Sequence, residues 1–164
     1  MQHFADVINR DLGKDIRMVP GAGAAGGLGG AFCAFLDGEL KSGIRTMLDL
    51  VHFNSLIENA DLIITGEGRA DGQSAQGKVL WGIGTSAREK EIPVIAIVGG
   101  MLPEAKKLYD CGITAIVPAL NYAMPLTDVL NHSKDLLRDA AERTFLLLKA
   151  GMSLTDSPLH RRIG

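Results

Sequence analysis

Hydrophobic positions in the first part of the chain recur with helical spacing. Residues 4–12 place their apolar side chains on one face of a helix, and Gly13 follows as a residue suited to end it. Residues 28–36 are apolar enough for a buried helix, and residues 44–57 repeat apolar positions at intervals of three and four. The pattern therefore predicts helices before residue 60, with only a short extended piece at 16–19.

The second half of the chain alternates between two patterns. Short apolar runs rich in β-branched residues lie at 61–65, 93–98 and 114–119, and helical patterns at 76–90 and 103–110 separate them. This alternation is typical of a βαβαβ unit. We therefore predict the α/β class, with a three-layer parallel sheet of the Rossmann or flavodoxin type that follows a glycine loop and a helical segment.

The chain closes with a long amphipathic pattern at 126–149. It predicts one helix that points Leu130, Leu137 and Leu147, among others, toward the core, with Gly151 as its stop. The remaining residues, 152–164, are polar, and we expect them to fray.

Composition and charge narrow the possible partners. The 164 residues are 46% hydrophobic and 22% charged, with a net charge of -2, which suits a soluble globular chain in the cytoplasm. No basic stripe suits nucleic acid, and no polybasic or long apolar run suits a membrane. Cys33 and Cys111 stand apart from each other and from any histidine, so we expect buried free thiols.

A glycine-rich stretch, residues 19–32 (the glycine segment), precedes the second predicted helix. Gly21, Gly23 and Gly26 fit the spacing G-x-G-x-x-G, but no second strand ending in an acid follows, which argues against a dinucleotide site. Two interpretations stay open. The backbone N–H groups from Gly21 to Gly27 bind an anion at a helix start, or the glycines permit close packing of a helix.

A second motif, TGEGRADGQSAQGKV at residues 65–79 (the charged motif), follows the first predicted strand. Gly72, Gly77 and Lys78 fit G-x-x-x-x-G-K, but Val79 stands where a phosphate-binding loop needs Ser or Thr. We expect a loop at the carboxyl end of a parallel strand, where open α/β sheets bind ligands.

The charged motif brings opposite charges together. Glu67 and Asp71 supply carboxylates, Arg69 and Lys78 supply cations, and glycines between them supply backbone freedom. A solvated charged loop has a similar composition, so this alternative also stays open.

Three blocks in order carry a resemblance to a known family: PGAGAAGGLGGAFCAFL with LKSGI, then ADLIITGEGRADGQSAQGK, then IPVIAIVGG. Residues 1–149 resemble the C-terminal part of the bacterial type 1 glycerate kinases. The family has a large apolar residue where this chain has Ala70, and a threonine where it has Ser74. Ser74 keeps the hydroxyl.

The resemblance implies ATP-dependent phosphorylation of D-glycerate to 2-phosphoglycerate, with Mg²⁺. It implies that residues 1–42 end a glycine-loop substrate domain and that 43–164 form the C-terminal part of a Rossmann-like domain. For catalysis we assign Glu67, Asp71 and Lys78, the two carboxylates also serving as metal ligands. The substrate and its phosphates are assigned to residues that offer backbone or polar donors: Gly21, Gly23, Gly26, Gly27, Arg69, Gln73 and Ser74.

Members of that family are longer, so we expect a fragment with little activity of its own and a tendency to self-associate. The kinase hypothesis predicts that Glu67, Asp71 and Lys78 converge and that the two motifs face one cleft. The alternative is a non-catalytic α/β module that binds a small anionic metabolite, or an inactive fragment, and it needs only a pocket at the glycine segment.

Overall fold

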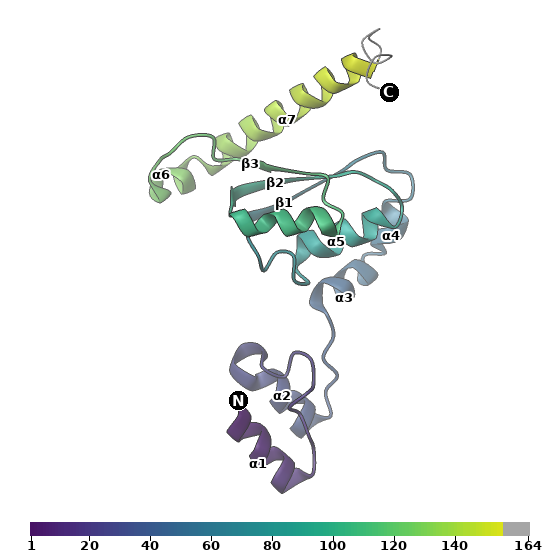
Figure 1. The fold of residues 1–164 in the computed structure, drawn as a ribbon, viewed down its shortest axis with the longest axis vertical. Helices are drawn as coiled ribbons and strands as arrows, with labels where there is room; N and C mark the ends of the chain where they lie inside the picture. Colours follow the sequence, from purple (N-terminus) through teal and green to yellow (C-terminus); the bar gives the residue numbers. More distant parts are fainter. Residues whose placement is uncertain (156–164) are drawn as a thin grey trace. The chain divides into compact units, whose positions relative to one another are not determined.

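The computed structural model describes residues 1–155 and divides into two compact units, Met1–Thr46 and a second one that begins at Met47 (Figure 1). Each unit is described by itself. No helix among the described residues is long and apolar enough to cross a membrane.

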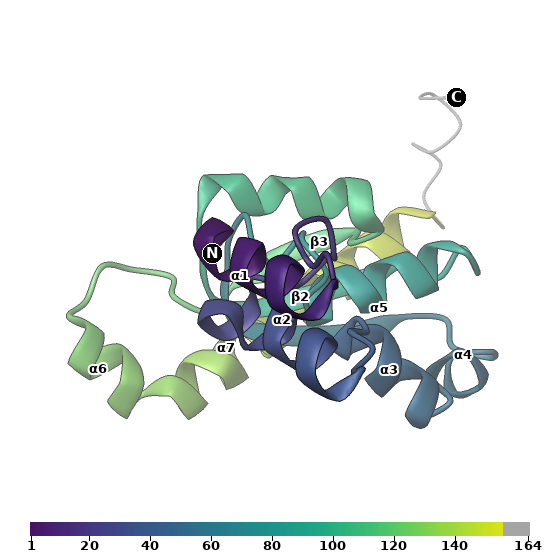
Figure 2. The same ribbon diagram turned by 90° about the horizontal axis from the view of Figure 1, so that it is seen from below.

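The first unit is built from two helices. Helix α1 (Gln2–Leu12) ends at Gly13, whose φ of 66° is the left-handed conformation predicted for this position. Helix α2 (Ala24–Leu36) lies beside α1 (Figures 1 and 2). Their shared core is small and consists of Ala5, Ile8, Ile16 and Ala34.

The predicted helix at 44–57 is interrupted. Helix α3 (Gly43–Leu50) begins in the first unit and ends in the second, and α4 (Phe53–Leu56) follows it. Between them His52 adopts a φ of 51°, and its carbonyl accepts from the N–H groups of Ser55 and Leu56. The helical prediction is confirmed for both segments, and a left-handed residue between them redirects the chain.

The second unit contains a three-stranded parallel sheet in the order β1-β2-β3. Its strands are β1 (Ile63–Ala70), β2 (Val94–Met101) and β3 (Ala115–Pro118). Helix α5 (Val79–Arg88) and the 3-10 helix η1 (Pro103–Cys111) connect them, which confirms the predicted βαβαβ order. The helix expected at 103–110 is of the tighter 3-10 type.

Both faces of the sheet are covered, as parallel sheets require. Along β2, Val94, Ala96 and Val98 face the layer of α5 and η1, whereas Ile95 and Ile97 pack toward the C-terminal helix α7 (Ser133–Thr155). Figure 1 shows α5 and η1 on one side of the strands and α7 on the other.

The C-terminal pattern forms two helices, α6 (Leu126–Asn131) and α7, separated at His132. Three predictions about this region were wrong. It is not one helix, Gly151 lies inside α7, and the side chains of Leu130, Leu137 and Leu147 are 65%, 52% and 71% exposed. Residues 152–155 continue α7, and the rest of the tail, 156–164, lies outside the described residues.

The two cysteines are free, as predicted, but each is only half-buried. Burial raises the pKa of the Cys111 thiol above its ordinary value, with a smaller contribution from the negative charge of Asp110.

Candidate functional site

Strand β1 extends through residues expected to form a loop. It pairs with β2 as far as Ala70 opposite Met101, so residues 66–70 of the charged motif are strand. The glycines permit close approach here, because a Cβ on Gly66 would lie 2.5 Å from the carbonyl oxygen of Ile97. The expectation of a loop beginning at residue 65 was wrong, and the loop begins at Asp71.

Asp71 is fixed at the carboxyl end of β1 by its own turn. Its Oδ1 accepts from the backbone N–H of Gln73 at 2.9 Å and of Ser74 at 3.3 Å. Its Oδ2 accepts from Arg69 Nη2 at 3.3 Å. The Asp71 side chain is 16% exposed and that of Arg69 is 69% exposed. One carboxylate oxygen is thus held by the backbone, while the other accepts from an exposed surface cation.

The same contacts set the charge state of Asp71. The backbone N–H of Gln73 is the largest cause that lowers the pKa of this carboxyl, and the N–H of Ser74, the positive charge of Lys78 and the bond from Arg69 act in the same direction. Asp71 is accordingly a carboxylate at neutral pH.

Ser74 and Lys78 complete the turn. Ser74 is fully buried, and its Oγ accepts from the backbone N–H of Asp71 at 3.2 Å. Lys78, the residue before α5, donates from Nζ to Gln73 Oε1 at 3.1 Å. Asp71, Gln73, Ser74 and Lys78 therefore form one connected network.

Glu67 lies on β1 and is half-buried. Its Oε2 is buried and has no hydrogen-bond partner among the described residues. Buried carboxylate oxygens without a partner are uncommon, and an absent ion or ligand group is one of their causes. Among the described residues no hydrogen bond or ion pair joins Glu67 to Asp71 or Lys78, and Lys78 is linked to Asp71 through Gln73. The convergence of all three side chains stays a prediction.

The glycine segment serves two purposes. Ala25, Gly26 and Gly27 have φ values of 50°, 69° and 104°, so the regular part of α2 starts only after them. Gly29 and Gly30 instead allow close packing, because a Cβ on Gly29 would lie 2.4 Å from the carbonyl oxygen of Gly21. Close packing thus accounts for the later glycines, and positive φ accounts for Gly26 and Gly27.

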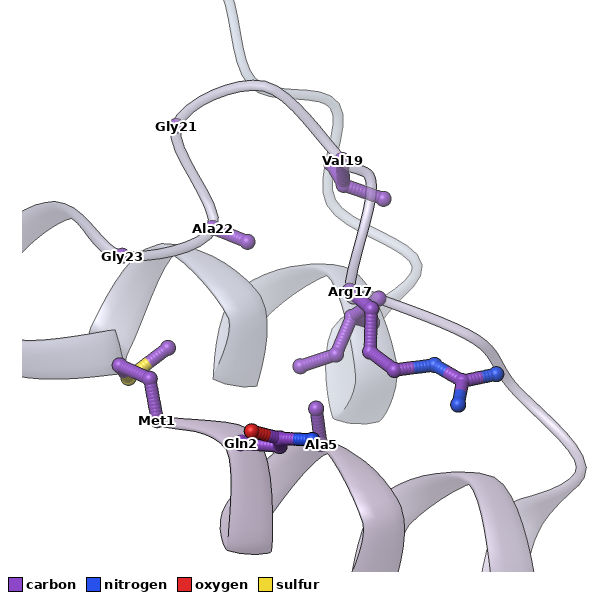
Figure 3. A pocket seen from close by; sticks show the side chains of 9 residues that line it. Met1, Gln2, Ala5, Arg17, Val19, Gly21, Ala22 and Gly23 are labelled. Carbon is purple, nitrogen blue, oxygen red and sulfur yellow. The ribbon is translucent and has the colours of Figure 1, made fainter.

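A pocket of about 420 Å³ lies in the first unit beside the glycine segment (Figure 3). Gly21, Ala22 and Gly23 form one side and the start of α1 forms another, so its lining is mostly apolar. Arg17, which no motif of the sequence marked as a site residue, contributes a charged side chain to this lining. Its Nε donates to Asp15 Oδ1 at 2.8 Å.

Comparison with known proteins identifies the origin of these motifs. A family profile described as "Glycerate kinase family" matches residues 1–149. The chain belongs to the glycerate kinase family. The two motifs lie in separate units of the structure, so a cleft shared between them stays a prediction.

Curated relatives carry the same family name. The chain is 39% identical over 157 residues to a glycerate kinase of Bacillus subtilis, covering 96% of this chain and 40% of the relative. It is 38% identical to the glycerate 2-kinase of Escherichia coli, covering 93% of this chain and 40% of that protein. The chain thus spans about two fifths of the length of these relatives.

A solved structure supports the fold. The crystal structure of a protein assigned as glycerate kinase 2 from Salmonella typhimurium LT2 matches with a TM-score of 0.67 and 35% identity. The match covers 93% of this chain and 39% of that structure. The mixed α/β architecture is therefore shared with this family member.

Proposed function

We propose that this chain supplies part of the active site of an ATP-dependent glycerate kinase of type 1, as its C-terminal portion in a cytoplasmic enzyme. The reaction transfers a phosphoryl group to the 2-hydroxyl of D-glycerate and gives 2-phosphoglycerate. Family membership and the names of the relatives support the reaction. The observation that carries the site is Asp71, a carboxylate fixed by backbone donors at the carboxyl end of a parallel strand.

The carboxylates of the charged motif suit a magnesium ion. The described residues contain no group of three or more His, Cys, Asp or Glu side chains able to hold a metal by themselves. Mg²⁺ is commonly bound by one or two carboxylates together with water and substrate phosphates, and the buried, unpartnered oxygen of Glu67 is consistent with a missing cation. Glu67 and Asp71 would hold the ion, which neutralises phosphate charge when bound.

Each residue of the network has a role in this proposal. The outward oxygen of Asp71 either holds the metal or accepts the proton of the glycerate hydroxyl. Lys78 and Arg69 stabilise the negative charge of the transferring phosphate, and Gln73 orients Lys78 through its amide oxygen. Ser74 is buried against Asp71, which supports positioning of that carboxylate more than direct contact with a substrate.

The glycine segment is proposed to bind the carboxylate or a phosphate through backbone N–H groups from Gly21 to Gly27, at the start of α2. A second candidate function, a non-catalytic module for a small anionic metabolite, is favoured by the pocket at Gly21–Gly23, which is complete within the first unit. The two functions differ in whether the charged motif is needed.

The test is a chimera in which residues 1–149 replace the matching segment of the Bacillus subtilis relative. We expect ATP- and Mg²⁺-dependent formation of 2-phosphoglycerate, detected by ³¹P NMR, which separates it from the 3-phosphate. Asp71→Asn keeps size and removes charge, and should lower turnover at least a hundredfold, whereas the exposed control Gln76→Ala should not. Full turnover in Asp71→Asn with unchanged melting would contradict the assigned site.

The isolated chain is proposed to self-associate and to have little kinase activity. In the described sheet β1 and β3 each pair on one edge only, and unpaired edges are sites of association. Light scattering on the purified chain should give a mass above that of a monomer. A clean monomer that turns over glycerate at ordinary enzymatic rates, on the order of 1–1,000 per second, would contradict this proposal.

A further inference from the structure

A polar cluster outside the proposed kinase site lies just beyond β3. Asn121 follows the end of that strand, and Asp139 and Arg143 lie one turn apart on α7. Asn121 Nδ2 donates to Asp139 Oδ2 at 3.1 Å, and Arg143 Nε donates to the same oxygen at 2.8 Å. The loop after β3 is therefore joined to α7 through these three side chains.

Arg143 retains an unused donor. Its Nη2 is buried and has no hydrogen-bond partner within residues 1–155, although 39% of the side chain is exposed. A buried guanidinium donor without an acceptor is costly and uncommon. Because Asp139 engages Nε and fixes the plane of the guanidinium, the terminal nitrogens are preorganised for a planar anionic group.

Another arginine of α7 shows that this is not a general feature of the helix. Arg138 also pairs with a carboxylate, donating from Nη1 to Asp135 Oδ1 at 2.8 Å. Its side chain is 76% exposed, and none of its nitrogens is among the buried, unpartnered atoms of the described residues. The buried, unsatisfied nitrogen therefore distinguishes Arg143 from an ordinary surface pair.

The position in the sheet suits a ligand. Ala119 and Leu120 donate backbone N–H groups to Val98 and Gly99, so the chain before Asn121 continues beside the end of β2. Open parallel sheets bind ligands at the carboxyl ends of their strands. Since neighbouring strands lie about 4.8 Å apart, this end of β3 is about 10 Å across the sheet from the end of β1.

We propose that Arg143, positioned by Asp139 and Asn121, binds an anionic oxygen group of a small-molecule ligand, either a carboxylate or a phosphate. The terminal nitrogens of the guanidinium donate to it, and the Asp139 carboxylate keeps the guanidinium oriented. This site goes beyond the proposed kinase function, which uses the charged motif and the glycine segment. Its test measures binding instead of turnover, so a failure of the kinase proposal would leave it standing.

The experiment is an NMR titration of the ¹⁵N-labelled chain. Inorganic phosphate and D-glycerate are added separately at constant ionic strength, and the Arg143 Nε–H and Asn121 side-chain amide signals are followed. We expect saturable shifts with at least one of these anions. Arg143→Gln should weaken that binding at least tenfold, and the matched control Arg138→Gln should leave it unchanged.

The outcomes separate the two sources of the anionic group. If phosphate alone causes saturable shifts, Arg143 binds a phosphoryl group. If glycerate alone causes them, Arg143 binds a carboxylate. Absence of saturation with both anions, or equal affinity in Arg143→Gln, overturns the proposal. Asp139→Asn provides a second variant, because it keeps the arginine and removes its anchor; it should weaken binding while circular dichroism shows an intact α7.

Discussion

The glycine segment and the charged motif both looked like ligand loops in the sequence, yet they are built in opposite ways. The glycine segment has no polar side chain, so it offers a ligand only backbone groups, and its shape depends on positive φ and close packing. The charged motif holds a network of side chains on the end of a strand. Substitutions in the first region should therefore act through folding, whereas substitutions of the charged side chains around Asp71 should affect chemistry before folding.

The largest effect is expected in the glycine segment. Gly29→Ala places a Cβ 2.4 Å from the carbonyl oxygen of Gly21, a backbone atom that cannot move freely. We expect a loss of about 3 kcal/mol, enough to unfold a unit whose core contains only four buried hydrophobic residues among those described. Gly23→Ala is the control, because nothing lies within 4 Å of its Cβ.

Hydrogen exchange measures this outcome by region. Amides of the first unit should lose protection in Gly29→Ala, while amides of β1 and β2 keep theirs. Equal protection in Gly29→Ala and Gly23→Ala would show that close packing does not explain Gly29.

The matching substitution in the charged motif is Gly66→Ala. Its Cβ would lie 2.5 Å from the carbonyl oxygen of Ile97 on the neighbouring strand, so β1 and β2 must separate locally. We expect a loss of about 2 kcal/mol in the unfolding free energy of the second unit, measured by urea denaturation. Gly68→Ala, whose Cβ meets nothing within 4 Å, should lose little. Similar losses in Gly66→Ala and Gly68→Ala would show that close approach of β2 does not explain the glycine at position 66.

Local sequence patterns predicted some features of this fold and missed others. The parallel βαβαβ order and the end of α1 at Gly13 were predicted from such patterns, and the structure confirmed both. The length of β1 could not be predicted in this way, because glycines spaced as at 66 and 68 are typical of a loop. Only the neighbouring strand shows that one of them is needed for close approach.

The same limit applies to side chains. Helix α7 carries leucines on more than one face, and the sheet that it meets decides which are buried, so Leu136 packs inward and Leu137 does not. The sequence predicted that Glu67, Asp71 and Lys78 converge. The structure joins Asp71 to Arg69 directly and to Lys78 through Gln73, and the place of Glu67 beside them stays a prediction. The burial of Ser74 and the pairing of Arg143 with Asp139 were missed, because both depend on packing that local patterns do not reveal.

A smaller effect tests the turn of the charged motif. Ser74→Ala removes the buried hydroxyl that accepts from the Asp71 N–H, and should cost about 1–2 kcal/mol in thermal or urea unfolding. Ser74→Thr keeps the hydroxyl and should recover part of this loss, while the exposed Gln76→Ala should have no effect. If the free energy of unfolding is unchanged in Ser74→Ala, water replaces the hydroxyl as the acceptor of the Asp71 N–H.

The smallest expected effects are changes in the pKa of one aspartate in each unit, Asp15 in the first and Asp71 in the second. In the first unit the side-chain hydrogen bond from Arg17, with its backbone N–H, lowers the pKa of Asp15 to about 2. In the second unit the largest cause that lowers the pKa of Asp71 is the backbone N–H of Gln73, and the bond from Arg69 is the smallest. Carboxyl ¹³C shifts measured against pH report both groups directly.

The two arginines should therefore differ when they are removed. Arg17→Gln should raise the pKa of Asp15 part of the way toward its unfolded value, because it removes the largest cause of the lowering and leaves the backbone N–H of residue 17 in place. Arg69→Gln should leave most of the lowering at Asp71. Because the folded pKa of Asp15 lies below its unfolded value, its contribution to stability is present above pH of about 3.9. It is lost as the pH falls through about 2. Equal responses to the two substitutions would mean that side chains, and not the backbone of the turn, hold Asp71 in its charged form.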